Sequence, residues 1–393
     1  MKIFTIIIFV LYPWLNSQAQ EEDAYGYFHA GKFDQSLSAF NLLIEGEMTP
    51  RSSDLLKRGI AYYRLGNFPA ALKDLKHAAE KEETEALLWL ARLHSVTGDT
   101  HAALTFLSEY VKKSNGLDFH LVRKDSLFRS YHGSDQWFNI WQDENLTEEA
   151  RVIDQARKFS IAGKREDAIL LLQSSNLNTP AVRTASSELY AEKGEIQFAV
   201  NELNKGLGMN PGNSALLKQK SKYLLKLGDS RTAFGILSQL VQSDPSDFSL
   251  HLLVANAALQ SGILDAAQQH IQIYLKYTDE EEAVLIAGKI DLEAGNYMNS
   301  IRYFNRLLER DSSNATYFKA RGMAYYQTNT FSQAAYDLSM SLDLVPYDGE
   351  SNYYLGLTQS KLGNKKAACY YMNRAKKYGD KRAHIYLIEN CGN

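Results

Sequence analysis

The sequence of 393 residues is poor in the residue types that build stapled or metal-dependent domains. Its two cysteines, Cys369 and Cys391, are too few for a disulfide scaffold or a zinc cluster. The 7 prolines and 24 glycines favour long helices joined by short turns. The sequence also contains no H-E-x-x-H, G-x-S-x-G or phosphate-loop motif. We therefore predict no enzymatic activity, no cofactor and no metal site.

An excess of charge of one sign is also missing. Lys and Arg number 43 and Asp and Glu 46, which gives a net charge of −3. A protein that grips nucleic acid through its backbone is usually strongly basic, so we predict no nucleic-acid partner. Apolar residues make up 45% of the chain and charged residues 23%, and these fractions are typical of a globular protein.

Long apolar runs are absent beyond the first 20 residues. There, Lys2 precedes an apolar run, and Ser17 and Ala19 are small residues at the positions that a signal peptidase reads. We predict a signal peptide, residues 1–19, with cleavage after Ala19; an uncleaved anchor helix is the alternative. No cysteine follows the run, so we expect no lipoprotein anchor. The mature chain is expected in the periplasm or cell envelope, without membrane insertion.

A repeat of about 34 residues occupies the remaining sequence. Its marker is a glycine or asparagine, and successive markers lie 31 to 35 residues apart except for one double step of 65. Each unit predicts two amphipathic helices, the first ended by the marker in a left-handed conformation. The markers are Gly31, Gly66, Gly98, Gly163, Gly194, Gly228, Gly262, Gly295, Asn329 and Gly363.

The unit around Gly59, Tyr62, Gly66, Phe68 and Ala71 resembles the tetratricopeptide repeat. The resemblance implies an all-α fold, a right-handed α-solenoid of about ten helix pairs plus one degenerate pair and a C-terminal capping helix. A short signal followed at once by such repeats is also similar to exported proteins of the Bacteroidota type. The prolines that close the repeat in this family appear as Pro211, Pro245 and Pro346.

The double step marks an irregular segment at residues 115–146. We expect a degenerate helix pair there, at about 119–131 and 135–142, with Gly133 as its marker, and it forms either a rigid junction or a hinge. Trp137, Phe138 and Trp141 crowd its second half, either as a hot spot for a partner or as rings that plug the junction. The expected domains are residues 1–19, the subarray 20–114 of three units, the junction 115–146, the subarray 147–380 of seven units, and the capping helix and tail 381–393.

In the tetratricopeptide family, the first helix of each pair lines a concave groove that binds a peptide or a partner helix. The resemblance therefore implies a non-enzymatic interaction scaffold or adaptor with a protein or peptide partner. One alternative is an envelope accessory factor that binds glycan through the junction aromatics, and another is a chaperone-like holder of exported clients. The expected groove residues are Tyr63, Trp89, Arg92, Lys218, Lys222, Lys226, Lys319, Tyr326, Tyr353 and Tyr354.

Two groups of these groove residues have alternative interpretations. Lys218, Lys222 and Lys226 are spaced four apart and share one helix face. They either receive acidic groups of a partner or are neutralised by Glu188 and Glu192 of the preceding unit. The three tyrosines Tyr326, Tyr353 and Tyr354 either form an aromatic patch in the groove or pack between helices.

The two cysteines lie near the C-terminal end. If the last repeat's second helix and the capping helix run antiparallel, Cys369 and Cys391 end nearly level with each other. In an oxidising compartment they either form a disulfide that pins the cap or remain two unpaired thiols.

Overall fold

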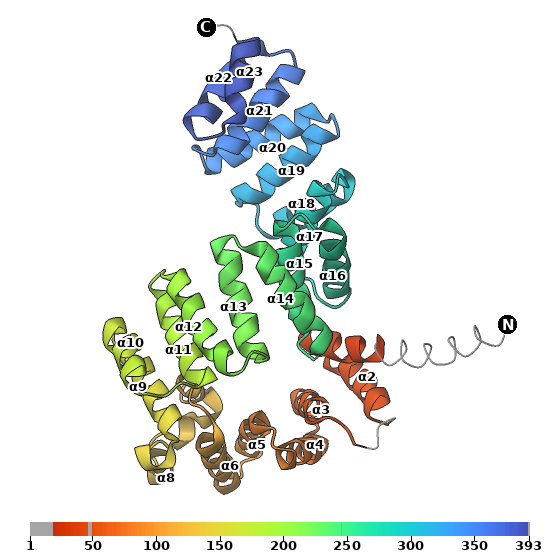
Figure 1. Cartoon of the computed structure of the whole chain (residues 1–393). Coiled ribbons are helices and arrows are strands. Elements are labelled where there is room, and N and C mark those ends of the chain that lie inside the picture. The colour runs from red at the N-terminus through yellow and green to blue at the C-terminus, as the bar shows by residue number, and fades with distance from the viewer. Residues whose placement is uncertain (1–18, 46–48, 245, 392–393) are drawn as a thin grey trace, which may run out of the picture. The chain divides into compact units, whose positions relative to one another are not determined.

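The computed structural model describes residues 19–45, 49–244 and 246–391, so residues 1–18 of the predicted signal peptide lie outside the described residues. Every regular element in these ranges is a helix, and consecutive helices pack against one another along the chain (Figure 1). The predicted all-α solenoid is thereby confirmed. Within the same ranges, no helix has the length and apolar character of a membrane span.

Ten regular helix pairs account for most of the described residues. Their first helices are residues 19–29, α3 (Ser52–Arg64), α5 (Thr84–Val96), α9 (Glu148–Ile161), α11 (Pro180–Glu192), α13 (Ser214–Leu227), α15 (Leu250–Gln260), α17 (Glu281–Glu293), α19 (Ala315–Gln327) and α21 (Gly349–Lys361). Their second helices are α2 (Phe33–Glu45), α4 (Phe68–Glu80), α6 (Thr100–Lys113), α10 (Arg165–Ser174), α12 (Ile196–Met209), α14 (Ser230–Ser243), α16 (Leu264–Tyr277), α18 (Tyr297–Arg310), α20 (Phe331–Leu344) and α22 (Lys365–Lys377).

The marker residues end the first helices as the sequence predicts. All ten have a positive φ, from +59° at Asn329 to +83° at Gly98. This left-handed conformation is strained for a residue with a Cβ, which is why nine of the ten positions are glycine. Gly133, the expected marker of the irregular segment, is not among the residues with positive φ.

A second small residue lets the two helices of a pair approach closely. A Cβ added at Gly59 of α3 would lie 2.9 Å from Cγ of Leu75 in α4. A Cβ added at Gly322 of α19 would lie 2.8 Å from Cγ of Leu338 in α20. Leu75 and Leu338 are both fully buried, so the repeating seam is a tightly packed core.

The irregular segment differs from the expected helix pair. It forms α7 (Phe119–Val122), the 3-10 helix η1 (Ser126–Tyr131), α8 (Asp135–Ile140) and the 3-10 helix η2 (Asp143–Asn145). The expected helix at 119–131 is wrong because the backbone is extended at Asp125, with ψ at 122°. The Asp125 carboxylate accepts a hydrogen bond from the amide of Leu127 at 3.1 Å, which begins a new turn.

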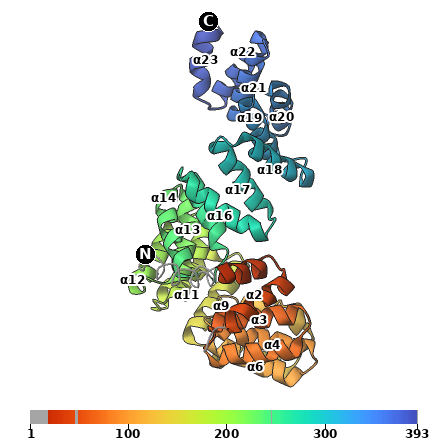
Figure 2. The same cartoon turned by 90° about the vertical axis from the view of Figure 1, so that its right-hand side faces the viewer.

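Two compact units divide the chain, Met1–Leu250 and His251–Asn393, and we call them the N-terminal and C-terminal units. The division falls at the start of α15, so it does not coincide with the expected subarray ends at 114 and 147. Residues 115–146 lie inside the N-terminal unit, where Phe119, Phe128 and Trp137 share one buried core with α5 and α6. Figures 1 and 2 show the pairs of each unit stacked in chain order.

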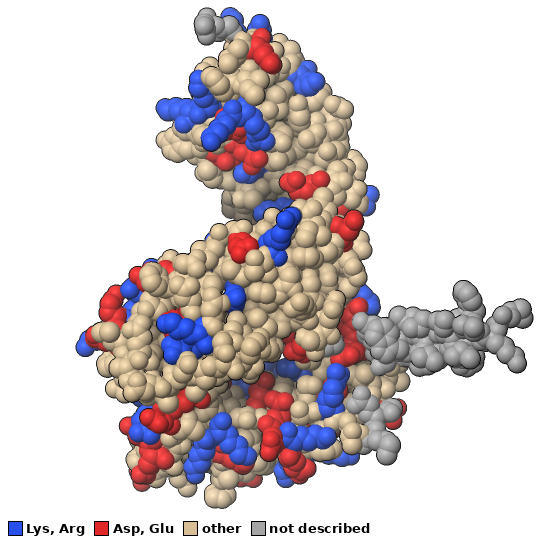
Figure 3. Space-filling model, viewed as in Figure 1, with Lys and Arg blue, Asp and Glu red and all other residues tan. Residues whose placement is uncertain are grey.

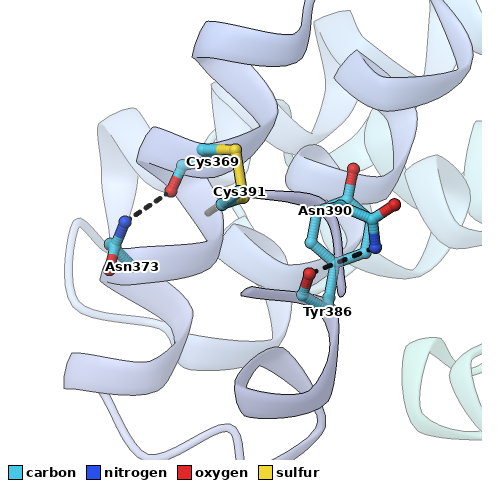
Figure 4. The surroundings of a disulfide bond; sticks show 5 residues. All are labelled: Cys369, Asn373, Tyr386, Asn390 and Cys391. Carbon is cyan, nitrogen blue, oxygen red and sulfur yellow. Dashed lines mark hydrogen bonds between the residues drawn. A yellow bond between two sulfur atoms is a disulfide. The ribbon is translucent and has the colours of Figure 1, made fainter. Parts of the chain in front are cut away.

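The capping helix is α23 (Arg382–Asn390), which buries Ala383 against Met372 and Ala375 of α22. A disulfide joins Cys369 of α22 to Cys391 at the end of α23, with the two Cα atoms 5.7 Å apart (Figure 4). Of the two alternatives for the cysteines, the structure therefore contains the bonded one.

Candidate functional site

The first helices of the C-terminal unit line a hollow of about 420 Å³. Its side chains come from consecutive pairs, so it runs across the repeats and not along one helix. We call this hollow, together with the tyrosines described below, the C-terminal groove. The hollow is lined by Leu259, Gly262, Leu264, Lys289, Leu292, Glu293, Thr316, Lys319, Ala320, Met323 and Glu350.

The hollow has an apolar floor. Leu259 and Leu292 each stand three residues before the marker of their unit, so the repeat places them side by side on successive first helices. Met323 of α19 continues the floor, and its unbranched side chain adapts to irregular shapes. All three side chains are partly exposed and can therefore cover an aliphatic group of a ligand.

A line of alternating charges borders this floor. The Lys319 ammonium lies 3.4 Å from Asp348 and 3.3 Å from Glu350, and Glu350 also contacts Arg382 of α23 at 3.4 Å. Burial opposes ionisation of Asp348, but hydrogen bonds from Ser351 and the charge of Lys319 outweigh it and lower the pKa of this carboxyl. On the face shown in Figure 3, Lys and Arg side chains of the C-terminal unit likewise lie next to Asp and Glu.

The three predicted tyrosines lie together at one end of the groove. The ring centres of Tyr326 and Tyr354 are 5.8 Å apart, and those of Tyr353 and Tyr354 are 5.6 Å apart, both in edge-to-face arrangements. Each ring is half-buried, so each packs between helices and also presents surface. Burial raises the pKa of Tyr354 and of Tyr326, which keeps both hydroxyls protonated at neutral pH.

Arg382 completes the tyrosine patch. Its guanidinium carbon lies 4.4 Å from the Tyr353 ring centre and 5.5 Å from that of Tyr354. A hydrogen bond to Asp380 is the largest contribution that raises the pKa of Arg382, which stays charged. Sequence reasoning missed Arg382 because it follows the last repeat, where no period assigns it a position. The repeat period could have identified Glu350, because it is the second residue of the first helix α21, as Thr316 is of α19.

Comparison with known proteins identifies the repeat. A sequence profile of the tetratricopeptide repeat matches residues 56–118, 219–280 and 287–349. The chain is a tetratricopeptide-repeat (TPR) protein. The matches fall in both units, and two of them, 219–280 and 287–349, include α15, α17 and α19 of the C-terminal groove.

The curated relatives are distant. BBSome complex member BBS4 from Bos taurus is 21% identical over 327 residues, which are 80% of this chain and 62% of that protein. TPR repeat-containing protein MJ1428 from Methanocaldococcus jannaschii is 20% identical over 376 residues, covering 86% of this chain and 66% of that protein. The chain thus spans less than two thirds of the length of these relatives.

Solved structures show the same fold. A TPR protein from Parabacteroides merdae covers 62% of this chain and 98% of its own, with a TM-score of 0.50 and 18% identity. The APC/C hetero-tetramer Cut9–Hcn1 contains a chain that covers 90% of this one and 80% of its own, with a TM-score of 0.52 and 15% identity. At these identities the likeness concerns the fold alone.

The lysine stripe on TPR helix α13 is only partly available to a ligand. Lys218 forms an ion pair with Asp247 and a hydrogen bond of 2.8 Å to Ser249, so the expected neutralisation by Glu188 and Glu192 is wrong for this residue. Those two glutamates instead bind Arg157 of α9, at 2.5 and 3.3 Å. The remaining stripe residues, Lys222 and Lys226, are exposed.

The predicted groove residues of the N-terminal TPR units form a closed stack. Trp89 is only 8% exposed, because Arg92 and Arg64 lie 4.6 and 5.3 Å from its ring centre and Tyr63 lies edge-on at 5.4 Å. Arg92 in turn pairs with Asp125 at 2.8 Å. Next to this stack, the short α7 leaves a hollow of about 630 Å³ that sequence reasoning did not predict.

The junction aromatics comprise the buried Trp137, the partly buried Trp141 and the exposed Phe138. Trp137 is 6% exposed and packs against Phe128, and its ring centre lies 5.5 Å from that of Trp141. The guanidinium carbon of Arg123 lies 4.2 Å from the centre of the Trp141 ring. Phe138 points outward and is 59% exposed. The packing of Trp137 and Trp141 against the shared core favours the interpretation that they plug the junction.

Proposed function

We propose that this TPR protein is a non-enzymatic scaffold or adaptor of the periplasm or cell envelope, and that its C-terminal groove binds an extended peptide or a partner helix. One observation carries the proposal. One compact unit combines an apolar hollow, two lysines and a tyrosine patch, built mainly from consecutive first helices. This combination offers apolar contact area and a few fixed polar groups, as peptide sites do.

The charges of the groove define the partner's chemistry. Among the described residues, Lys289 makes no ion pair, although it lines the hollow beside Leu292. Lys319 is held by two carboxylates at distances of more than 3 Å, so a ligand carboxylate can compete for it. We therefore infer a partner segment that places an aliphatic side chain on the floor and an acidic group near Lys289.

Two features support the proposed location. The first residues have the pattern of a signal peptide, and a disulfide such as Cys369–Cys391 persists in oxidising compartments and is rare in a reducing cytosol.

A role in assembling a complex also agrees with the name of the relative BBS4, which is described as a member of a complex.

Site-specific crosslinking in the native cells tests this function. A photo-crosslinking amino acid replaces Met323 on the groove floor, and in a matched variant it replaces Glu309, an exposed residue of the second helix α18. We expect one or two proteins to be captured in near-stoichiometric amounts from position 323 and not from position 309. Adding Lys289→Glu to the first variant should abolish the capture, because it repels the partner's acidic group.

Other outcomes contradict the proposal in different ways. Equal capture from positions 323 and 309 would show that the groove is not the binding site. A broad spread of exported clients would favour the chaperone-like holder. Envelope glycan captured without any protein would favour an accessory factor.

A further inference from the structure

The C-terminal end of the last TPR unit is strongly basic. Residues 361–382 contain eight Lys or Arg residues and one acidic residue, Asp380, so this segment carries a net charge of +7 in a chain whose total is −3. Such segregation creates a local positive potential that the composition of the whole chain conceals. The basic residues are Lys361, Lys365, Lys366, Arg374, Lys376, Lys377, Lys381 and Arg382.

The structure places most of this charge on the outer surface and not in the groove. Helix α22 buries Ala368, Met372 and Ala375. Lys366, Tyr370, Asn373 and Lys377 follow one another by four, three and four residues on the opposite side of the helix, and all four are exposed. Lysines 361, 365, 376 and 381 are also exposed. We call these six lysines and Tyr370 the basic outer surface.

These lysines are not neutralised by the protein itself. Within the described ranges, none of the six has a carboxylate within ion-pair distance, and α22 contains no acidic residue. Some exposed lysines elsewhere in the described part of the chain are paired, such as Lys193 with Glu195 and Lys205 with Glu202, and others such as Lys73 are not, but the basic outer surface gathers six unpaired lysines within residues 361–381. Six like charges on one surface produce a positive potential that attracts an anionic partner.

Exposed aromatic groups adjoin the lysines. Tyr370 is 56% exposed and Tyr347 is 72% exposed. Arg374 connects them, since its guanidinium carbon lies 5.7 Å from the Tyr370 ring centre and 5.3 Å from that of Tyr378, which in turn lies 5.3 Å from Tyr347. The basic outer surface is therefore continuous with a group of tyrosines.

We propose that the basic outer surface binds the face of a phospholipid bilayer that contains anionic lipids. Lysine is a compact charge that suits a diffuse negative surface, whereas bidentate recognition of single phosphates relies on arginine. Tyrosine is the side chain that settles between headgroups and acyl chains. The helix face is also outward-facing, so it can lie against a broad flat surface more easily than it can enclose a peptide. The groove of the same unit stays open for its partner.

Vesicle sedimentation tests this proposal. The purified protein is mixed with vesicles of phosphatidylcholine, or of phosphatidylcholine with phosphatidylglycerol. We expect binding only to the anionic vesicles and release by salt, because salt screens charges that are exposed to solvent. The double variant Lys366→Glu/Lys377→Glu should lower binding at least about tenfold. Tyr370→Ala should weaken binding several-fold without any change of charge.

The matched control makes the same change of charge elsewhere. Lys73 and Lys76 are exposed on α4 of the N-terminal unit, and Lys73→Glu/Lys76→Glu should bind vesicles like the wild type. The groove variant Lys289→Glu should also bind normally, which separates this test from that of the proposed function. Circular dichroism melts verify that each variant is folded.

Three results would overturn the proposal. The first is equal binding to neutral and anionic vesicles. The second is undiminished binding of the Lys366→Glu/Lys377→Glu variant. The third is binding to polyglutamate with none to anionic vesicles, which would identify an acidic protein as the partner of this surface.

Discussion

The guanidinium of Arg382 lies over the ring of Tyr353, 4.4 Å from its centre. This contact joins the capping helix α23 to the first helix of the last TPR pair. Because Arg382 also contacts Glu350, the capping helix forms part of the groove wall in addition to covering the end of the core. The position of α23 therefore affects binding as well as stability.

We expect the disulfide to stabilise α23 and, through Arg382, the groove. It closes a segment of 22 residues, and removing such a crosslink costs about 3 kcal/mol of unfolding free energy. Cys369→Ser/Cys391→Ser should therefore lower the melting temperature of the C-terminal unit and speed hydrogen exchange in α23 and α21. Reductant should reproduce both effects in the wild type and change nothing in the variant. A wild-type protein whose exchange in α21 ignores reductant would refute the link to the groove.

The close approach at Gly322 predicts opposite effects for two glycine substitutions. Gly322→Ala places a Cβ 2.8 Å from Cγ and 3.2 Å from the backbone nitrogen of Leu338. The substitution should therefore destabilise the protein by about 1–3 kcal/mol. Gly235→Ala, inside α14 with nothing within 4 Å of the added Cβ, should stabilise it by about 0.5–1 kcal/mol. Chemical denaturation measures both, and the same sign for both variants would contradict the seam described above.

The junction offers a similar matched pair. Trp137→Ala should cost about 3–5 kcal/mol of stability, because the ring is 6% exposed inside the shared core. Phe138→Ala, next to it but 59% exposed, should change stability by less than about 0.5 kcal/mol. Thermal melts separate the two. If Trp137→Ala melts like the wild type, the plug interpretation fails.

Two buried histidines predict a loss of stability in mild acid. Nδ1 of His251 lies 2.9 Å from Nδ1 of His270. Burial lowers the pKa of His251 to about 4, with a further contribution from His270, and burial also lowers the pKa of His270. Between pH 6.5 and 4 the unfolded chain therefore binds more protons than the folded one, and acidification favours unfolding.

We expect the C-terminal unit to lose about 2 kcal/mol between pH 7 and pH 5 from this histidine pair. His251→Gln/His270→Gln should flatten the dependence of the melting temperature on pH in that window. His101→Gln, at an exposed position of α6, serves as the control and should leave the dependence unchanged. An unaltered slope in the double variant would show that the pair does not titrate as proposed.

The features that could be predicted from the sequence are those that every repeat must satisfy. A marker such as Gly228 is visible because only a few residue types tolerate its left-handed conformation, so its recurrence reveals the period and the helix ends. The level placement of Cys369 and Cys391 follows from the same geometry, because two antiparallel helices of known ends place the residues side by side, whereas the sequence left open whether they are bonded. A repeat pattern therefore fixes the position of a residue along the solenoid.

The features that could not be predicted depend on a single partner. Lys218 pairs with Asp247 in a loop and not with the glutamates at equivalent repeat positions, and no period reports a loop conformation. The break at Asp125 depends on one carboxylate that competes with the helix for the backbone amide of Leu127. The basic outer surface went unnoticed because the near-neutral total charge masks a local excess.

In a repeat array the terminal pair has a sequence neighbour on one side only, so a free end loses order most easily. The disulfide is the single covalent crosslink in the described residues, and it closes the C-terminal end. The bond limits the freedom that α22 and α23 gain when this end frays, so it opposes fraying there. At the other end, a non-covalent contact between His29 of the first pair and Phe248 holds the helices, with the two ring centres 5.6 Å apart. Because Arg382 of α23 forms part of the groove wall, we expect the disulfide to protect the binding surface against fraying from the C-terminal end.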